Sequence, residues 1–248
     1  IGCPVFTPYK QNGEINYDCI PSYALLIAKL KFDCVLVGGT TGDWALLTLE
    51  ERKCLLSAWV NQCKQHNIKI VFNISDSCID NVHVLLNEAK KLEVWCVLIV
   101  GSPIVRTNNI VEYLSKATKN YNFIYYHYPE LYGYNNVKLD NILQIANCIG
   151  IKIVDNSISI PKTHKLLFIS DENYKKGYST FTSELNIFYL TTETLQDINN
   201  FVNENGKKSC NRYFVEKIFN IQLGLPRYPN TIIENEDELY NLFLKILV

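Results

Sequence analysis

The chain lacks an excess of either charge and any long hydrophobic run. Its 248 residues carry 24 Lys and Arg against 25 Asp and Glu, for a formal net charge of −1. Without a basic excess or a basic run we expect no nucleic-acid partner and no membrane surface. No segment reaches the ~18 uninterrupted apolar residues that a membrane span needs, and no secretory signal is visible. With 48% hydrophobic residues, residues 1–248 are expected to form a single large globular domain.

Metal-ligand spacing is also missing. The four histidines stand apart from one another, and no two of the nine cysteines form a C-x-x-C pair. This argues against a zinc centre. Several cysteines lie inside apolar runs, as in Asp33–Leu36 and Trp95–Leu98. An odd, scattered set of this kind is typical of reduced, buried thiols in a cytoplasmic protein.

Methionine is absent altogether. A chain of this length would ordinarily contain several, so one hypothesis is that residues of the natural chain are missing here, above all after Phe181. An intact mass equal to the 28.6 kDa of this sequence would contradict that hypothesis.

What the chain does contain is a repeated unit, a short apolar run followed by a helical stretch. Successive runs begin roughly 27–34 residues apart, which is the length of one βα unit. Runs this solidly apolar indicate strands of a parallel sheet that are buried on both faces. The expected strands are Gly2–Thr7, Cys34–Gly38, Ile68–Ile74, Trp95–Val100, Asn122–Tyr126, Ile149–Val154 and, more weakly, Gly177–Phe181.

Amphipathic stretches between the runs predict the helices of these units. The first follows Asn16 as its expected cap, and the second opens with the capping-box pattern of Thr48 and Glu51. The expected helices are Tyr17–Leu30, Thr48–Gln65, Asp80–Leu92, Ile110–Tyr121 and Lys138–Ile149, with two more near Asn211–Leu223 and Asn235–Val248.

Seven such units in one chain predict a (β/α)8 TIM barrel. No eighth strand is evident between Phe181 and Asn211, so we expect that part of the barrel to be degenerate or missing. Residues 199–248 would form a C-terminal helical extension. A doubly wound open sheet is the alternative fold, but it would need a glycine-rich phosphate turn, and no G-x-G-x-x-G is present.

Lys152 is a lone cation in the apolar run Ile149–Val154. Burying an ammonium group is costly, so burial here would lower its pKa and favour a neutral amine. A neutral amine can attack a ketone and form a Schiff base. The alternative is a lysine at a strand end whose head group extends into water.

Two other motifs end predicted strands, where the chemistry of such a barrel lies. The glycine-rich turn Gly38–Asp43 offers amides and threonine hydroxyls to a carboxylate, although a turn chosen only for its geometry would look the same. The run Tyr125–Pro129 offers phenols that can move a proton beside a Schiff base, or that simply pack at the barrel rim. The stretch Pro4–Pro8 is expected to be a structural element of the rim.

In order and spacing these motifs resemble those of the N-acetylneuraminate lyase and dihydrodipicolinate synthase family of class I aldolases. The resemblance covers most of the chain, from Phe6 to about Phe181. The family's G-T-T-G-E, L-T-x-E-E/R, Y-x-x-P and G-[IV]-K motifs correspond to Gly39–Asp43 (with Asp for Glu), Leu47–Arg52, Tyr126–Pro129 and Gly150–Lys152.

The resemblance implies that Lys152 forms a Schiff base with the ketone of an α-keto acid such as pyruvate. Tyr126 would move the proton during C–C cleavage or formation. The iminium acts as the electron sink, so no metal or organic cofactor is needed. The family is commonly tetrameric, so a homo-oligomer is expected. The residues expected to hold the substrate are Gly39, Thr40, Thr41, His127, Asp155, Ser179 and Glu184.

Departures from the synthase branch favour a lyase that cleaves a sialic acid or a related 2-keto-3-deoxy sugar acid to pyruvate and an aldehyde. Leu131 stands where synthases usually carry an arginine, and Gly101–Val105 lacks their tyrosine. The acidic pair of lyases is absent from Gly177–Phe181, with Glu184 as a shifted substitute, and Val154 replaces a frequent hydroxyl. A 2-keto-3-deoxygluconate aldolase and a non-catalytic keto-acid-binding protein are therefore the alternatives.

Overall fold

The computed structural model describes residues 2–100, 110–128, 137–153, 163–169 and 179–180, together with Arg212, Val215, Glu216, 220–224, Arg227, Asp237 and Asn241. Its strands form one parallel eight-stranded sheet in which each strand pairs with the next along the chain. They are β1 (Gly2–Pro4), β2 (Cys34–Val37), β3 (Lys69–Asn73), β4 (Cys96–Val100), β5 (Phe123–His127), β6 (Cys148–Ile153), β7 (Leu166–Ile169) and β8 (Ser179–Thr180).

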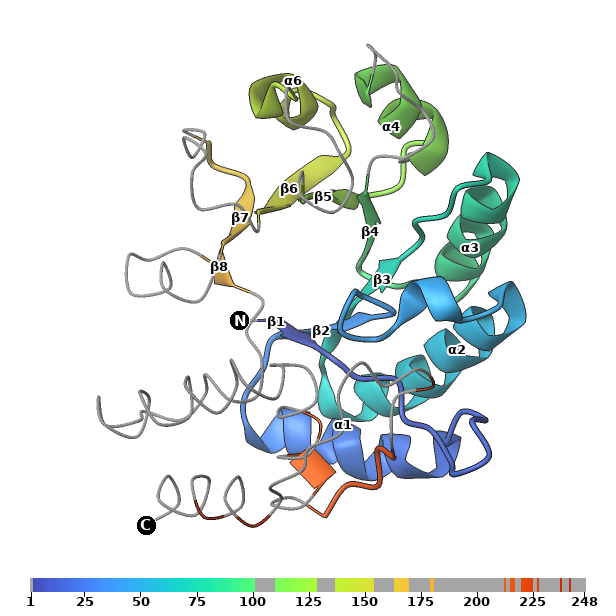
Figure 1. Cartoon of the computed structure of the whole chain (residues 1–248). Helices are drawn as coiled ribbons and strands as arrows, with labels where there is room; N and C mark the ends of the chain where they lie inside the picture. The colour runs from blue at the N-terminus through green and yellow to red at the C-terminus, as the bar shows by residue number, and fades with distance from the viewer. Residues whose placement is uncertain are drawn as a thin grey trace.

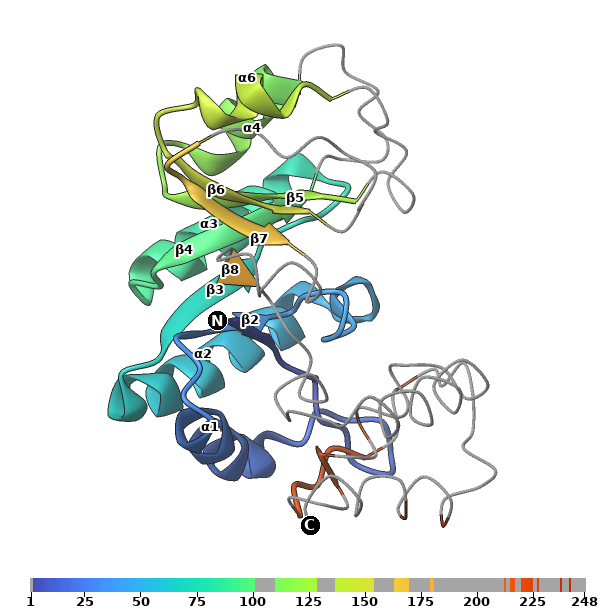
Figure 2. The same ribbon diagram turned by 90° about the vertical axis from the view of Figure 1, so that its left-hand side faces the viewer.

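The sheet curls about a central axis, with the helices on its outside (Figure 1). In the perpendicular view of Figure 2, as in Figure 1, β8 again lies beside the beginning of β1. The helices are the 3₁₀ turns η1 (Tyr17–Cys19) and η2 (Trp44–Leu46) and the α-helices α1 (Ile20–Lys29), α2 (Leu49–His66), α3 (Ile79–Lys91), α4 (Ile110–Thr118) and α6 (Leu139–Leu143). The predicted (β/α)8 barrel is confirmed, and the described part of its eighth strand is Ser179–Thr180.

Alternate residues of each strand contribute to two separate cores, as the period of a strand requires. One set packs with the helices and includes Val35, Phe72 and Ile151. The other set forms a cluster inside the curl of the sheet: Cys34, Leu36, Val71, Cys96, Leu98, Val100, Ile124, Tyr126 and Phe168. Parity along a strand therefore shows which side chains face the barrel axis.

The numbering of the last strands corrects the sequence prediction. The weak run Gly177–Phe181, expected as the seventh strand, contains β8 instead. The seventh strand is Leu166–Ile169, which was not expected, and it pairs with β6 through Gly150 and Leu166. A Cβ at Gly150 would collide with the Leu166 carbonyl oxygen, so a residue without a side chain is needed where these two strands approach.

The helix ends agree with the sequence in part. Thr48 and Glu51 form the expected capping box of α2. Asn16 precedes η1 but does not cap it, because its side-chain amide donates to the Gln222 carbonyl at 3.2 Å. Helix α4 ends at Thr118, before the predicted Tyr121, because the next two residues have left-handed backbones.

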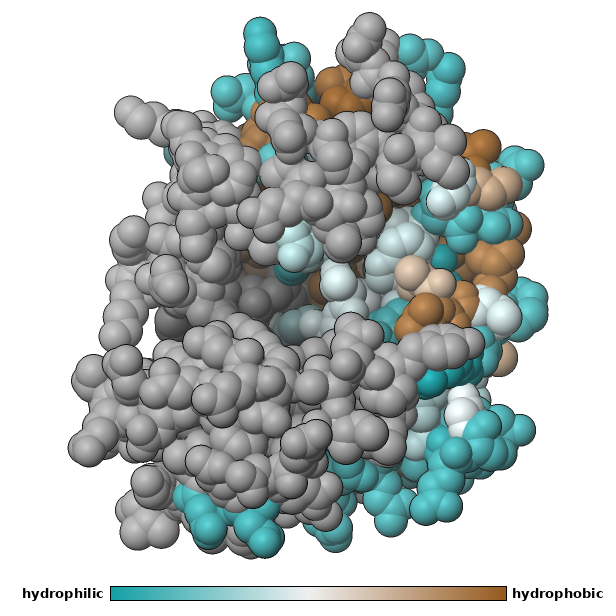
Figure 3. All heavy atoms as spheres, viewed as in Figure 1, coloured by the Kyte–Doolittle hydropathy of each residue, from teal (hydrophilic) through white to brown (hydrophobic). Residues whose placement is uncertain are grey.

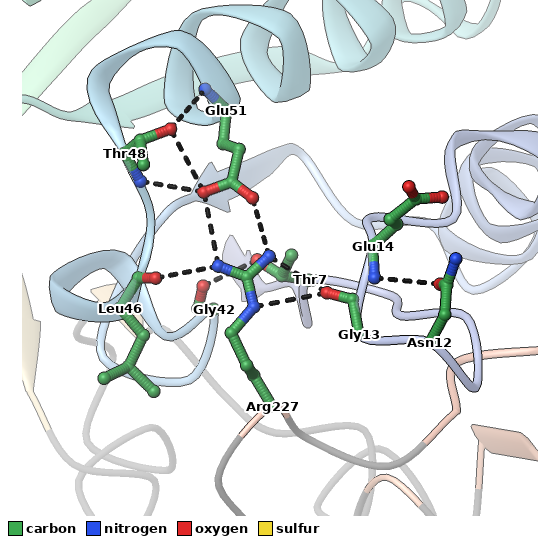
Figure 4. Close-up of polar contacts among 9 residues, drawn as sticks. All are labelled: Thr7, Asn12, Gly13, Glu14, Gly42, Leu46, Thr48, Glu51 and Arg227. Atoms are coloured by element: carbon green, nitrogen blue, oxygen red, sulfur yellow. Dashed lines mark hydrogen bonds and ion pairs between the residues drawn. The ribbon is translucent and has the colours of Figure 1, made fainter.

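A residue of the C-terminal segment is anchored at the start of α2 (Figure 4). The Arg227 guanidinium pairs with Glu51 at 2.6 Å and donates to the carbonyls of Leu46 and Gly13, each at 3.0 Å. The single domain and the helical extension at 199–248 stay predictions, because most of that extension lies outside the described residues.

The described part of the outer surface that faces the viewer in Figure 3 is mixed in polarity. Figure 3 shows hydrophilic residues beside hydrophobic ones over the described helices at the right of the view. The exposed large apolar side chains of the described residues include Ile79 and Val84 of α3. None of the helices among the described residues has the length and apolar character needed to cross a membrane.

Candidate active site

Lys152 lies near the C-terminal end of β6 and faces the inside of the barrel. Its neighbours Ile151 and Ile153 pack with the helices, so the intervening side chain points to the opposite face. The sheet register pairs Lys152 with Tyr126 of β5 on one side and with Phe168 of β7 on the other. The lysine is partly buried at the barrel mouth. Its exposure is intermediate between the two alternatives that the sequence allowed, a buried amine and a head group that extends into water.

Tyr126 lies directly beside this lysine. The Nζ atom of Lys152 is 3.7 Å from the centroid of the Tyr126 ring, close enough for a cation–π interaction. The Tyr126 hydroxyl is 3.4 Å from the hydroxyl of Thr40. Burial raises the pKa of Tyr126 to about 12, although the hydrogen bond with Thr40 acts in the opposite direction. At neutral pH the phenol therefore carries its proton and can donate it.

Thr40 belongs to the glycine-rich turn that follows β2. Internal hydrogen bonds fold this turn, because Gly42 N–H donates to the Gly39 carbonyl at 3.0 Å and Asp43 N–H donates to the Thr40 carbonyl at 3.3 Å. The Thr7 hydroxyl donates to the Gly42 carbonyl at 2.6 Å. Thr7 therefore serves the structural role expected for the Pro4–Pro8 stretch.

An ion pair lies below this turn. Asp43, in a left-handed conformation at φ 57°, is 8% exposed, and its carboxylate is 3.7 Å from the guanidinium of Arg212. Arg212 also donates to the carbonyls of Thr7, Leu223 and Gly224 at 2.9–3.0 Å. Burial lowers the pKa of Arg212, with Asp43 opposing the shift. The aspartate thus ties the turn to the C-terminal segment.

Three elements distant in sequence therefore present an amine, a phenol and a turn rich in hydroxyls and amides to one another. The model of the dihydrodipicolinate synthetase family matches residues 1–167. The chain belongs to this family.

Individual relatives are distant. An N-acetylneuraminate lyase from Xenopus tropicalis is 28% identical over 135 residues, which are 52% of this chain and 44% of that protein. A 4-hydroxy-tetrahydrodipicolinate synthase from Wigglesworthia glossinidia brevipalpis is 27% identical over 177 residues, or 68% of this chain and 58% of that protein. The matched part of the chain thus spans about half the length of these relatives.

Solved structures share the fold over nearly the whole chain. An N-acetylneuraminate lyase from Proteus mirabilis superimposes with a TM-score of 0.81 at 18% identity, covering 99% of this chain and 96% of that one. CdNal from Clostridium difficile, in complex with mannosamine, gives a TM-score of 0.86 at 19% identity, with 99% and 98% covered. At such identities the likeness shows the fold of the family and no more.

The structure brings together only some of the residues expected from the family motifs. Lys152, Tyr126 and Thr40 meet, and Gly39 and Thr41 belong to the same turn. His127 does not join them. It is 2% exposed and its ring lies 5.9 Å from that of Tyr125, on the face of β5 that packs with the helices. This position argues against the substrate contact expected for His127.

The remaining expected substrate contacts stay predictions. Ser179 begins β8, next to β7. Asp155 and Glu184 lie outside the described residues. Among the residues that are described, no group of three or more His, Cys, Asp and Glu side chains is placed to hold a metal ion.

Three buried polar residues that sequence reasoning missed lie beside the glycine-rich turn. Asn73 and Ser75 are each 1% exposed at the end of β3, and Arg52 of α2 is 2% exposed beside them. One signal was available, since Asn73 interrupts the apolar run Ile68–Ile74. A polar residue inside a buried run needs a partner.

Proposed function

We propose that this protein is a class I Schiff-base aldolase that cleaves a sialic acid or a related 2-keto-3-deoxy sugar acid to pyruvate and an aldehyde. The observation that carries the proposal is the juxtaposition of Lys152, Tyr126 and Thr40 at the C-terminal ends of strands on one barrel. An amine, a proton-carrying phenol and a carboxylate-binding turn are the parts that this chemistry needs.

The proposed reaction begins when the neutral amine of Lys152 attacks the C2 ketone of the substrate. Loss of water leaves an iminium ion, whose positive nitrogen accepts the electrons of the C3–C4 bond as that bond breaks. The proton of the C4 hydroxyl passes to a base in the same step, and the aldehyde departs. We assign these proton transfers to Tyr126: its phenol gives a proton to the hydroxyl that leaves as water, and the resulting phenolate accepts the C4 proton and returns it to C3 of the enamine. Water then hydrolyses the iminium and releases pyruvate and the free amine.

The turn after β2 would bind the carboxylate of the keto acid. Its threonine hydroxyls and backbone N–H groups are donors, and hydrogen bonds to a carboxylate are about twice as strong as those between neutral groups. The hydrogen bond between Thr40 and Tyr126 supports this assignment, because it places the carboxylate site beside the proton carrier.

The choice of substrate rests on the sequence. Leu131 offers no charge for the second carboxylate that a synthase substrate carries, and Gly101–Val105 contains no tyrosine. Both features favour the lyase branch. The lack of an acidic pair in Gly177–Phe181 favours a second candidate, an aldolase for 2-keto-3-deoxygluconate. This sugar acid lacks the N-acetyl group of a sialic acid.

Turnover separates these candidates. The purified protein would be given N-acetylneuraminate or 2-keto-3-deoxygluconate, and the pyruvate released would be measured by a coupled dehydrogenase. A third assay would supply pyruvate and aspartate semialdehyde to test synthase activity. Release of pyruvate from N-acetylneuraminate supports the proposal. Condensation of pyruvate with aspartate semialdehyde, without pyruvate release from either sugar acid, contradicts it. Pyruvate binding without turnover of any substrate would identify a non-catalytic keto-acid-binding protein.

We further propose that the protein works in the cytoplasm as a homotetramer. Buried cysteines such as Cys34, Cys63 and Cys96 are free thiols, which suits a reducing compartment. Sedimentation equilibrium tests the assembly, and a monomeric mass at micromolar concentration would contradict it.

A further inference from the structure

A buried amide holds the glycine-rich turn from below. Asn73 is the last residue of β3, and its position two residues after Val71 places its side chain inside the barrel. Its Nδ2 atom donates to the Gly38 carbonyl at 2.8 Å. Gly38 is the first residue of the turn that carries Thr40 and Thr41, so this hydrogen bond joins the end of β3 to the base of the proposed carboxylate site.

The other half of the same amide is also fixed. Asn73 Oδ1 accepts from the Ser75 N–H at 3.1 Å and from the Ser75 hydroxyl at 2.6 Å. The Ser75 hydroxyl oxygen in turn accepts from the Val100 N–H at 2.9 Å. These bonds assign the orientation of the Asn73 amide, because only its NH₂ group can face the Gly38 carbonyl. The ends of β2, β3 and β4 are thereby joined through two side chains.

Arg52 completes this network from α2. Its guanidinium donates to the carbonyls of Asn73 and Ser75 at 2.7 and 3.0 Å, and it lies 3.6 Å from the Asp76 carboxylate. The guanidinium also lies 5.3 Å from the ring of Trp44, which follows the turn. Burial lowers the pKa of Arg52 to about 10, so it remains a cation at neutral pH. The backbone at the end of β3 is therefore fixed by Arg52, through the carbonyls of Asn73 and Ser75, and by the hydrogen bonds of the Asn73 side chain.

The hydrogen bond to Gly38 controls which way the turn presents its N–H groups. In a planar trans peptide the carbonyl and the next N–H point in opposite directions, so fixing the Gly38 carbonyl also fixes the Gly39 N–H. The carbonyls of Gly39 and Thr40 are already engaged by N–H groups further along the turn. Within the described part of the chain, the N–H groups of Gly39, Thr40 and Thr41 donate to no protein acceptor.

We propose that Asn73 is a positioning residue for keto-acid binding, which orients these three N–H groups toward the substrate carboxylate. The inference rests on the proposed function and names a residue that the family motifs do not include. The turn requires such a support because Gly38 has a left-handed φ of 65°, and a Cβ there would meet only the Cβ atom of Trp44, at 4.0 Å. A glycine there adopts several conformations at similar cost, so the local backbone does not select one by itself.

The test compares two ketones that differ in one group. Pyruvate has a carboxylate and acetone has none, and borohydride reduction traps the Schiff base of either one on Lys152. The quantity measured is the ketone concentration that gives half-maximal trapping. Asn73→Asp keeps the shape and the acceptor for Ser75 but turns an oxygen toward the Gly38 carbonyl. Asn73→Ala removes the donor without adding a charge, and serves if the aspartate variant does not fold.

Asn147 offers a matched control at the opposite end of the barrel. Its Nδ2 atom donates to the Tyr121 carbonyl at 2.6 Å and to the Thr118 hydroxyl at 2.9 Å, just before β6 begins. Asn147→Asp therefore removes the same kind of bond far from the turn. Thermal unfolding of each variant, followed by circular dichroism, measures the general loss of stability.

For the Asn73 variants we expect the half-maximal pyruvate concentration to rise by about tenfold or more, the worth of one lost charge-assisted hydrogen bond. The value for acetone should change less than about twofold, and Asn147→Asp should leave both values unchanged. Equal changes for the two ketones, or none for pyruvate, would overturn the role of Asn73 while leaving the Schiff base intact. Failure of the unmodified protein to trap pyruvate would overturn the proposed function as well.

Discussion

The Nζ atom of Lys152 lies 3.7 Å from the centroid of the Tyr126 ring, on adjacent strands whose register pairs these two residues. An aromatic face attracts a cation. The iminium of the proposed intermediate is a cation, so the ring can stabilise it. The same residue thus contributes a ring to the amine and a hydroxyl to the proton path, and the two contributions can be separated by mutation.

Tyr126→Phe keeps the ring and removes the hydroxyl. We expect pyruvate trapping on Lys152 to persist, while turnover falls by ~10²–10⁴-fold, the usual contribution of a general acid–base group. Tyr126→Leu removes the ring as well and should weaken trapping too. Steady-state kinetics and borohydride trapping measure the two effects. A fall in turnover of less than about tenfold in Tyr126→Phe would remove this residue from the proton path.

Thr40→Val tests the hydroxyl that contacts Tyr126 at 3.4 Å. The substitution keeps the shape but loses a donor to the substrate carboxylate, so we expect KM for the keto acid to rise by roughly tenfold. Thr40→Ser retains the hydroxyl and serves as the control, with KM close to that of the unmodified protein. If both variants show the same KM, the hydroxyl does not hold the substrate.

Arg212→Met tests the ion pair below the turn. Arg212 is 3% exposed, and its loss removes the cation beside the buried Asp43 carboxylate. Breaking one partner of a buried pair costs about 3–5 kcal/mol, so the free energy of unfolding in urea should fall by that amount. Adding Asp43→Asn should recover part of the loss, because the amide is neutral and tolerates the left-handed φ. Strictly additive losses in the double variant would show that the two side chains are not coupled.

Stability should fall at alkaline pH because of buried thiols. Burial raises the pKa of Cys19, Cys34 and Cys63 from 9.0 to about 12. Between these values the unfolded chain loses the thiol protons and the native protein keeps them, so each pH unit should cost about 1.4 kcal/mol per thiol. Below pH 9.0 these groups leave stability unchanged.

Urea midpoints at about pH 8 and about pH 10.5 measure this slope. Cys63→Ala should reduce the slope by about one proton. Cys54→Ala should leave it unchanged, because Cys54 is exposed. Equal stability at the two pH values would contradict the protected state of the buried thiols.

The sequence predicted most of the barrel because solidly apolar runs and helical stretches alternate at one spacing. That regularity fails after β6. The start of β7 follows the start of β6 much sooner than earlier strands follow one another, and its run is only the four residues Leu166–Ile169. A count based on spacing therefore passed over it and took the residues of β8 as the seventh strand. Leu166 is recognised as part of a strand because it pairs with Gly150 of β6. Such pairing depends on the folded structure and leaves no local pattern in the sequence.

The candidate site was predictable where a motif carries its own chemistry. Lys152 was evident as a cation in an apolar run, and the turn after β2 was evident from its glycines. The role of His127 in substrate binding stays a prediction, and the alternation of a strand places this residue on the opposite side of β5 from Tyr126. Asn73 and Ser75 were missed because their role depends on Gly38 and Val100 of neighbouring strands, which no local pattern reveals.

The most direct measurement of the central claim is mass spectrometry of the protein after borohydride reduction in the presence of pyruvate. The account predicts one reduced pyruvate adduct, located on the peptide that contains Lys152. Lys152→Ala should form no adduct while retaining the circular dichroism spectrum of the unmodified protein. An adduct on another lysine, or none on a folded protein at saturating pyruvate, would contradict the assignment of this amine as the nucleophile.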